Sequence, residues 1–159
     1  MASRAIDLLI AYRVIKLLVT PFEKTDAFKQ GIIDKDGNVL KKYRTLQSSN
    51  EKQAYTMLHR FVFNLKRILA KVGIRGALGS FAVAAALLFK ENKEFVKYKS
   101  LIESTILKHL KETNQYDEFL AEHREISEID DEPIGTYFGV DVYDRNGKLV
   151  SEFDYAKTL

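Results

Sequence analysis

Apolar and polar residues follow a helical pattern between residues 48 and 72. Apolar residues recur there in steps of three and four, which places them on one stripe of an α-helix, and basic residues fill most of the positions between. Ser48 and Glu51 have the spacing of a capping box at the start, and Gly73 suits the residue that follows a helix end. We therefore expect one amphipathic helix from about residue 49 to 72.

The next stretch, residues 77–89, has no polar face. Gly79 and Ser80 are its only residues that are not apolar. A helix that is apolar on all sides lies in a protein core or in lipid, and a membrane span needs about 20 apolar residues. Because Lys90 ends this run too early, we expect a buried central helix at about residues 77–90. Insertion into a membrane is the alternative.

Helical spacing also predicts helices at residues 3–19 and 93–111, and a short one near Tyr116. Two other segments place short β-type runs around Asp36-Gly37 and Asn146-Gly147, which are pairs that favour hairpin turns. We expect hairpins at about 31–41 and 137–153, which could pair into one small sheet. The expected fold class is mainly α, a helical bundle around the apolar central helix with one or two short β-hairpins.

We expect two parts of unequal size: a helical domain at residues 1–126 that contains the small hairpin insert, and an acidic linker with a C-terminal hairpin tail at 127–159. Charge supports this division, because residues 1–111 hold 21 Lys and Arg against 9 Asp and Glu, whereas residues 112–159 hold 4 against 13. Such asymmetry suggests a basic face for an anionic partner. The alternative is that the acidic part packs on the protein's own basic surface.

Catalytic chemistry has little support. The chain has no cysteine, and no glycine-rich phosphate-binding or nucleophile motif. Its three histidines, His59, His109 and His123, lie on different predicted helices without a second ligand at metal spacing. The acidic run at 130–132 is more typical of a solvated linker than of a cation site. We expect no enzymatic activity, no cofactor, no bound metal and no small-molecule substrate.

Two surfaces are candidates for binding. Basic residues along and after the predicted 49–72 helix could neutralise the phosphates of nucleic acid or meet an anionic membrane surface: Lys52, Arg60, Lys66, Arg67, Lys71 and Arg75. If the C-terminal hairpin stays unpaired, its open edges could add to a partner's sheet. The candidate docking residues are Tyr137, Phe138, Val140, Val142, Tyr143 and Leu149.

Three strings in the N-terminal half resemble known proteins. They are Arg-Ala-Ile-Asp-Leu-Leu at residues 4–9, Val-Thr-Pro-Phe-Glu-Lys-Thr-Asp-Ala-Phe-Lys-Gln-Gly-Ile-Ile-Asp at 19–34, and Tyr-Thr-Met-Leu-His-Arg-Phe-Val-Phe-Asn-Leu-Lys-Arg at 55–67. Over about residues 4–91 the chain resembles small virion-structural or head-internal proteins of tailed bacteriophages. The resemblance implies a non-enzymatic component of the particle, present in many copies or at a symmetric vertex, and brings no catalytic residues.

Three functions follow as hypotheses. The first is a virion structural or assembly protein, made in the host cytoplasm, that docks to other virion proteins in a multi-copy assembly and turns a basic face toward packaged DNA, with non-specific contact. The second is an internal ejection protein whose apolar helix engages a membrane. The third is a small nucleic-acid-binding or regulatory module. The resemblance favours the first.

Overall fold

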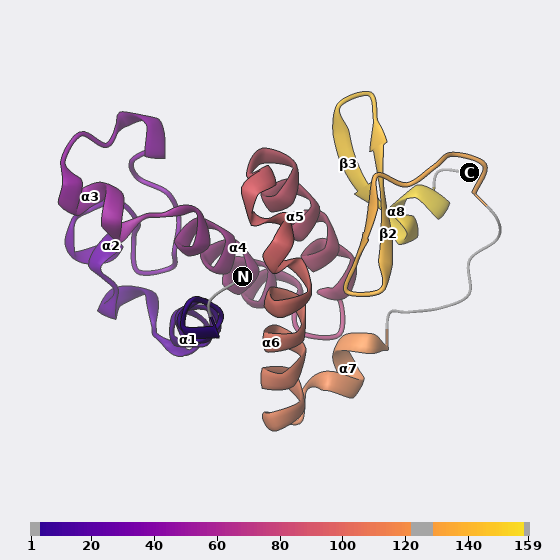
Figure 1. Cartoon of the computed structure of the whole chain (residues 1–159), viewed down its shortest axis with the longest axis horizontal. Coiled ribbons are helices and arrows are strands. Elements are labelled where there is room, and N and C mark those ends of the chain that lie inside the picture. The colour runs from indigo at the N-terminus through magenta and orange to yellow at the C-terminus, as the bar shows by residue number, and fades with distance from the viewer. Residues whose placement is uncertain (1–3, 122–128, 158–159) are drawn as a thin grey trace.

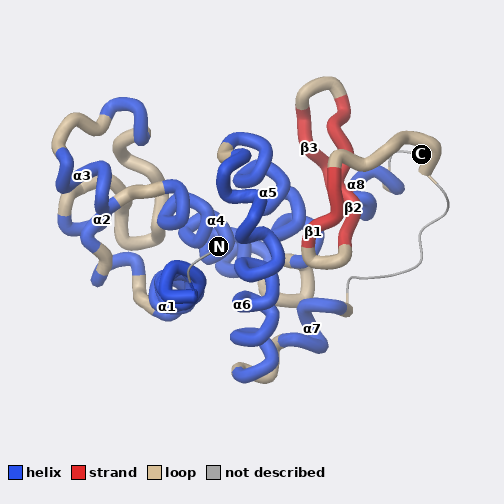
Figure 2. The backbone as a smooth tube through the Cα atoms, in the orientation of Figure 1, coloured by secondary structure: helices blue, strands red, loops and turns tan. Residues whose placement is uncertain are grey.

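The computed structural model describes residues 4–121 and 129–157, and it is mainly helical with one small antiparallel sheet. In Figure 1 the N-terminal elements lie on the left, α4, α5 and α6 in the middle, and the sheet on the right. Figure 2 shows the strands confined to that right-hand side. The elements are α1 (Arg4–Val19), α2 (Asp26–Lys29), α3 (Ser49–Ala54), α4 (Met57–Val72), α5 (Leu78–Glu91), α6 (Lys99–Glu112), α7 (Tyr116–Leu120), β1 (Gly135–Tyr137), β2 (Val140–Arg145), β3 (Lys148–Ser151) and α8 (Glu152–Ala156), with short 3-10 helices η1 (Phe22–Lys24), η2 (Tyr43–Thr45) and η3 (Lys93–Tyr98).

The expected single helix at 49–72 is wrong, because the chain forms two helices there. The capping box at Ser48 and Glu51 is confirmed, and it starts α3. A second box then starts α4: the Thr56 hydroxyl accepts from the backbone N–H of His59, and the His59 ring accepts from the backbone N–H of Thr56. Between the two helices, Tyr55 leaves the helical conformation. The glycine after α4, Gly73, has the positive φ that the sequence suggested.

The apolar helix α5 is buried as expected, and its neighbours differ on its two sides. It packs on α4 and on all three strands of the sheet, so the expected helical bundle around it is not confirmed. Four buried alanines, at positions 82, 84, 85 and 86, keep the helix narrow. At Gly79 the sheet side comes so close that an added Cβ would lie 3.0 Å from Ser151 Oγ and 3.1 Å from Phe153 Cδ2.

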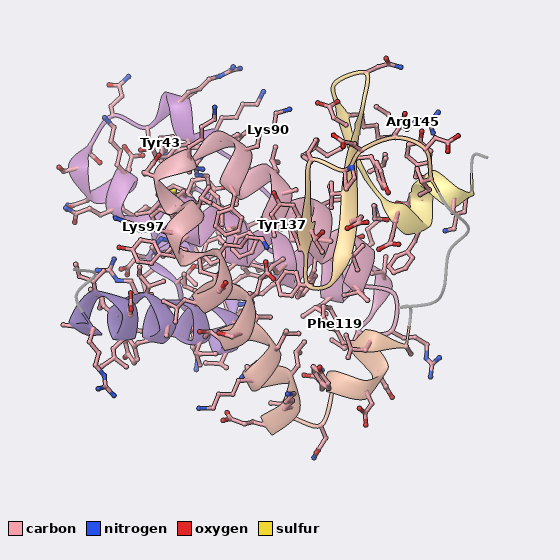
Figure 3. All side chains as sticks on the ribbon, turned by 45° about the vertical axis from the view of Figure 1, so that its right-hand side comes forward. Tyr43, Lys90, Lys97, Phe119, Tyr137 and Arg145 are labelled. Carbon is pink, nitrogen blue, oxygen red and sulfur yellow. The ribbon has the colours of Figure 1, made fainter. Side chains whose placement is uncertain are left out.

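The C-terminal hairpin is confirmed and has a third strand. Two-residue turns with positive φ, Phe138-Gly139 and Asn146-Gly147, join the strands in the order β1-β2-β3, which is the geometry that favours antiparallel hairpins. Phe153 of α8 and Phe119 of α7 are buried in the same core as the strands and α4–α6, and Figure 3 labels Phe119 and Tyr137 where helices and sheet meet. The predicted domain boundary at residues 126 and 127 lies outside the described residues.

The expected hairpin at 31–41 forms only in a reduced form. Only one isolated bridge, between Ile33 and Val39, forms in this segment. Ile32 and Ile33 are both buried, so side chains do not alternate as they would in a half-buried strand. Backbone N–H groups of Asp34 and Leu40 donate across the segment to the carbonyls of Asn38 and Ile32, at 3.0 and 2.7 Å. The Asp34 side chain also accepts from the backbone N–H groups of Asp36 and Asn38, at 2.9 and 2.8 Å. The segment forms a compact loop, and it does not pair with the C-terminal strands.

This loop belongs to a second, smaller core. Its buried members come from α2, the 31–46 loop, α3 and α4: Ala27, Ile32, Ile33, Leu46, Ala54, Tyr55 and Phe63. Leu17 of α1 packs against both this small core and the main one. Helix α1 therefore lies across the junction of two cores, which positions the cleft described next.

Candidate functional site

The six basic candidate residues do not form one free surface. Three of them, on α4, contact residues of the segment 20–43. The Arg60 guanidinium lies 4.3 Å from the ring centre of Tyr43, the Lys66 ammonium donates to the Thr20 carbonyl and lies 4.3 Å from the Phe22 ring centre, and Arg67 Nη1 donates to the Gly37 carbonyl at 2.7 Å. Burial at this position lowers the pKa of Lys66.

The remaining three candidates are exposed and come from separate places. Lys52 lies on α3, Lys71 in the last turn of α4, and Arg75 in the loop after it. A phosphate backbone could reach these three cations, but Arg60, Lys66 and Arg67 already have partners within the chain. The prediction of a six-residue anionic-surface site on one face is therefore corrected to three exposed cations without a shared helix face.

The six docking candidates of the C-terminal hairpin belong to the protein's own core. Tyr137, Phe138, Val140, Val142 and Tyr143 are buried, and Leu149 is half-buried against the main core. The hairpin packs on α5 because its inward side chains and the apolar helix cover each other. Their expected contact with a partner is corrected for this reason: five of the six side chains are buried, and Leu149 is only partly exposed.

Between the acidic and basic halves, the described residues contain one ion pair, from Lys90 Nζ to Asp144 Oδ2 at 3.5 Å. Both side chains are substantially exposed, so this pair contributes little to stability. Of the two alternatives for the acidic part, packing on the chain's own basic half is supported by apolar contacts rather than by charge. Asp131, in the acidic run, accepts a hydrogen bond from the Tyr155 hydroxyl.

The structure brings together a cleft that the sequence did not indicate. It has a volume of about 710 Å³ and lies where α1, the η1–α2 segment, α3 and α4 meet. Its charged lining residues are Arg13 and Lys16 from α1, Lys24 from η1 and Asp26 from α2. The other polar lining residues are Thr20, Thr25, Gln30, Asn50, Gln53, Thr56 and His59.

The local structure of each wall is fixed by a cap. The Thr25 hydroxyl accepts from the backbone N–H of Phe28 at 3.2 Å and so begins α2. On the opposite wall, Thr56 and His59 begin α4, with Thr56 Oγ1 and His59 Nδ1 2.7 Å apart. Because the backbone N–H of Thr56 also donates to Nδ1, at 3.3 Å, the neutral ring carries its proton on Nε2.

Positive charge dominates the cleft. Three cations face one carboxylate, and among the ion pairs of the described residues none involves Arg13, Lys16 or Lys24. The positive charge of the cleft also acts on His59, on the α4 wall. Burial lowers the pKa of His59, the nearby Arg13 cation lowers it further, and Asp26 acts in the opposite direction. The surroundings thus favour the neutral form of His59 in a cleft that carries excess positive charge.

Within residues 4–121 and 129–157, no three His, Cys, Asp or Glu side chains gather where they could hold a metal ion. His123 lies outside these ranges. Over the same ranges, no helix has both the length and the apolar content that crossing a membrane requires.

The chain was also compared with known proteins. No protein-family model, no curated protein and no solved structure matches it.

Proposed function

We propose that this chain is a non-enzymatic structural or assembly protein of a phage particle, and that it docks to another particle protein through the outward face of α1. The observation that carries the proposal is the exposure of that face. Leu8, Tyr12 and Val19 are 63%, 61% and 58% exposed. With the half-buried Ile15 they recur in steps of four, three and four, so they form one stripe along the helix.

This stripe is an unusual feature for a free surface. Scattered single apolar residues are normal on protein surfaces, whereas contiguous apolar patches mark interaction sites. Leu9, 47% exposed, flanks the stripe at its N-terminal end. The opposite face of α1 already packs on α4 and α6. Leu8, Tyr12 and Val19 are therefore left largely uncovered by the described residues, and a partner that covers them would gain hydrophobic stabilisation.

The charge at the border of the stripe indicates the chemistry of the partner. Arg4 and Lys16 are exposed beside it and take part in no ion pair among the described residues. The only carboxylate of α1, on Asp7, shares the inward stripe with Ile10 and Val14. A second copy of α1 would thus bring more cations to the border. We infer that the partner is a different particle protein with an apolar surface bordered by acidic residues.

The proposal that the particle is a phage particle depends on the resemblance of residues 4–91 to virion-structural and head-internal proteins. A contact with packaged DNA would depend on the three exposed cations Lys52, Lys71 and Arg75, and it is not needed for docking. The docking proposal and the DNA contact are therefore separable by mutation.

Mass spectrometry of purified particles, from the phage that encodes this chain, tests the proposal. The wild-type protein is expected in a fixed copy number that survives removal of DNA. The double substitution Leu8→Asp with Tyr12→Asp is expected to lower its content about tenfold or more, since two buried apolar side chains are lost from the interface. The matched control is Leu40→Asp with Val96→Asp, at positions 61% and 49% exposed on other elements, and it should be incorporated normally. Absence of the wild-type protein from particles contradicts the proposal.

A further inference from the structure

Apart from Lys16, the cleft between α1, η1–α2, α3 and α4 shares no residue with the proposed docking face of α1. We propose that it is a binding site for a small phosphorylated polyanion, which it holds as a ligand and does not transform. The proposal depends on charge, on free hydrogen-bond donors and on shape, and each of these is given by the lining residues.

The net charge of the lining residues indicates the sign and the size of the ligand's charge. Arg13, Lys16 and Lys24 reach the cleft from two elements, and Asp26 offsets one of them. The site thus has an excess of two positive charges, which suits a ligand with at least two negative ones. The guanidinium of Arg13 can hold two phosphate oxygens at once, while the two lysines act as movable point charges.

The neutral polar groups of the cleft supply further donors. Gln30, Asn50 and Gln53 line it from the α2 end and from α3. Among the hydrogen bonds of the described residues, none uses the side-chain amide of these three residues. Their N–H groups are available to phosphate or hydroxyl oxygens. His59, whose proton lies on Nε2, adds one neutral donor on the α4 wall.

Shape favours a small ligand over a nucleic acid. The volume of about 710 Å³ is that of a small-molecule site. Its walls come from α1, η1, α2, α3 and α4, and Leu17, Ala54 and Leu58 are the only apolar lining residues. No Phe, Tyr or Trp side chain lines it, so the cleft lacks the stacking platform on which single-stranded nucleic acids are bound. A rigid duplex could touch only its rim.

The position of the cleft gives a second readout. It lies at the junction of the main core and the small core. A ligand that contacts α1 on one side and α3 on the other therefore connects the elements around the two cores. A ligand that binds only the folded state raises the free energy of unfolding in proportion to the logarithm of its concentration. Binding should therefore appear both in calorimetry and as a rise in the thermal midpoint.

The test titrates sodium triphosphate, as the probe, into the full chain by isothermal calorimetry. Saturable binding at one site is expected. Arg13→Gln and Lys24→Gln should each weaken it about tenfold or more, which is the loss expected for one charge-assisted hydrogen bond. Arg44→Gln and Lys42→Gln are the matched controls, because both residues are exposed and outside the cleft, and they should bind like the wild type. Arg13 and Lys24 are also exposed, so these variants should fold, which circular dichroism confirms.

Three results would overturn the proposal. The first is the absence of saturable triphosphate binding. The second is an equal loss in the cleft variants and the controls, which would indicate only the net charge of the protein. The third is duplex DNA that binds more tightly than triphosphate and loses this advantage in Arg13→Gln and Lys24→Gln, which would make the cleft a nucleic-acid contact. The single docking substitution Leu8→Asp should keep triphosphate binding unchanged, whereas Tyr12 is left as it is because Lys16 of the cleft lies over its ring.

Discussion

Helices α1 and α5 are both rich in apolar residues, yet their surroundings differ. In α5, nine of fourteen residues are buried. In α1, only Ile10 and Val14 of sixteen residues are. The cause is the number of neighbours: α5 lies between α4 and the sheet, whereas α1 packs on α4 and α6 with one side and leaves the other in solvent, at the edge of the molecule in Figure 1.

The difference in burial between α1 and α5 shows that the two helices are apolar for different reasons. The apolar residues of α5 are explained by the chain's own core, because removing them would leave the sheet and α4 without a contact. The outward apolar residues of α1 contribute little to that core. Their exposure on the surface is the reason for proposing a docking site there.

The largest contrast is expected from shortening one side chain on each helix. Phe81 of α5 is 1% exposed, and its ring lies 5.1 Å from that of Phe119 and 5.9 Å from that of Phe138. Phe81→Ala should lower the free energy of unfolding by about 3–5 kcal/mol, because it leaves a cavity in the main core. Leu8→Ala on α1 should change it by less than about 0.5 kcal/mol. Urea-induced unfolding measures both, and equal losses would show that α1 is part of the core.

Enlarging a small residue gives the reverse experiment. At Gly79 of α5 a longer side chain meets Ser151 and the buried ring of Phe153. Gly79→Leu should therefore cost about 1–3 kcal/mol through overpacking. Ala5 of α1 is exposed, and Ala5→Leu should stay within about 0.5 kcal/mol of the wild type. Thermal unfolding followed by circular dichroism compares the two. A tolerated Gly79→Leu would contradict the close packing of α5 on the sheet.

A change of pH is expected to have a smaller effect on the free energy of unfolding, and to act at the α1 side of the molecule rather than at α5. Helix α5 has no ionisable residue before Lys90, whereas His59 lies in the cleft beside α1. Burial lowers the pKa of folded His59 below its ordinary value of 6.5. The unfolded chain therefore binds a proton first as the pH falls. The contribution of neutral His59 to the free energy of unfolding is therefore complete above pH 6.5, the ordinary pKa. This contribution is lost as the pH falls through the pKa of the folded state, by at most about 1.4 kcal/mol per pH unit.

His59→Gln isolates this contribution, since glutamine at the same position can accept from the Thr56 N–H and does not titrate. The free energy of unfolding is measured for both proteins between about pH 8 and about pH 5. The wild type should lose more stability than the variant over this range. Parallel profiles would show that His59 is free to protonate in the folded protein.

The elements that the sequence predicted well are those with local causes. The run at 77–89 predicted α5 because no polar residue interrupts it, and Asn146-Gly147 predicted a hairpin turn because both residues take positive φ. The division of the 49–72 helix was missed. Histidine is not the residue expected opposite Thr56 in a capping box, so only the geometry of His59 reveals the second start.

The surfaces could not be predicted because they depend on tertiary packing. In the sequence Arg60, Lys66 and Arg67 resemble a free basic flank, and only the fold of residues 20–46 gives them partners. The cleft joins Arg13 to Gln53 and His59, which are far apart along the chain. No spacing rule connects such residues. For α1, the apolar spacing indicates a covered side that includes Ile10 and Val14, but it does not show that apolar residues on the other side stay exposed.

The most direct test of the docking surface is a photo-crosslinker in place of Tyr12, with the same group in place of Leu40 as the control, since the two positions are equally exposed at 61%. Irradiation of assembled particles should give one crosslinked species from position 12, formed with a particle protein other than this chain, and none from position 40. No crosslink from position 12, or the same products from both positions, would contradict the proposal that the outward face of α1 is where this protein docks.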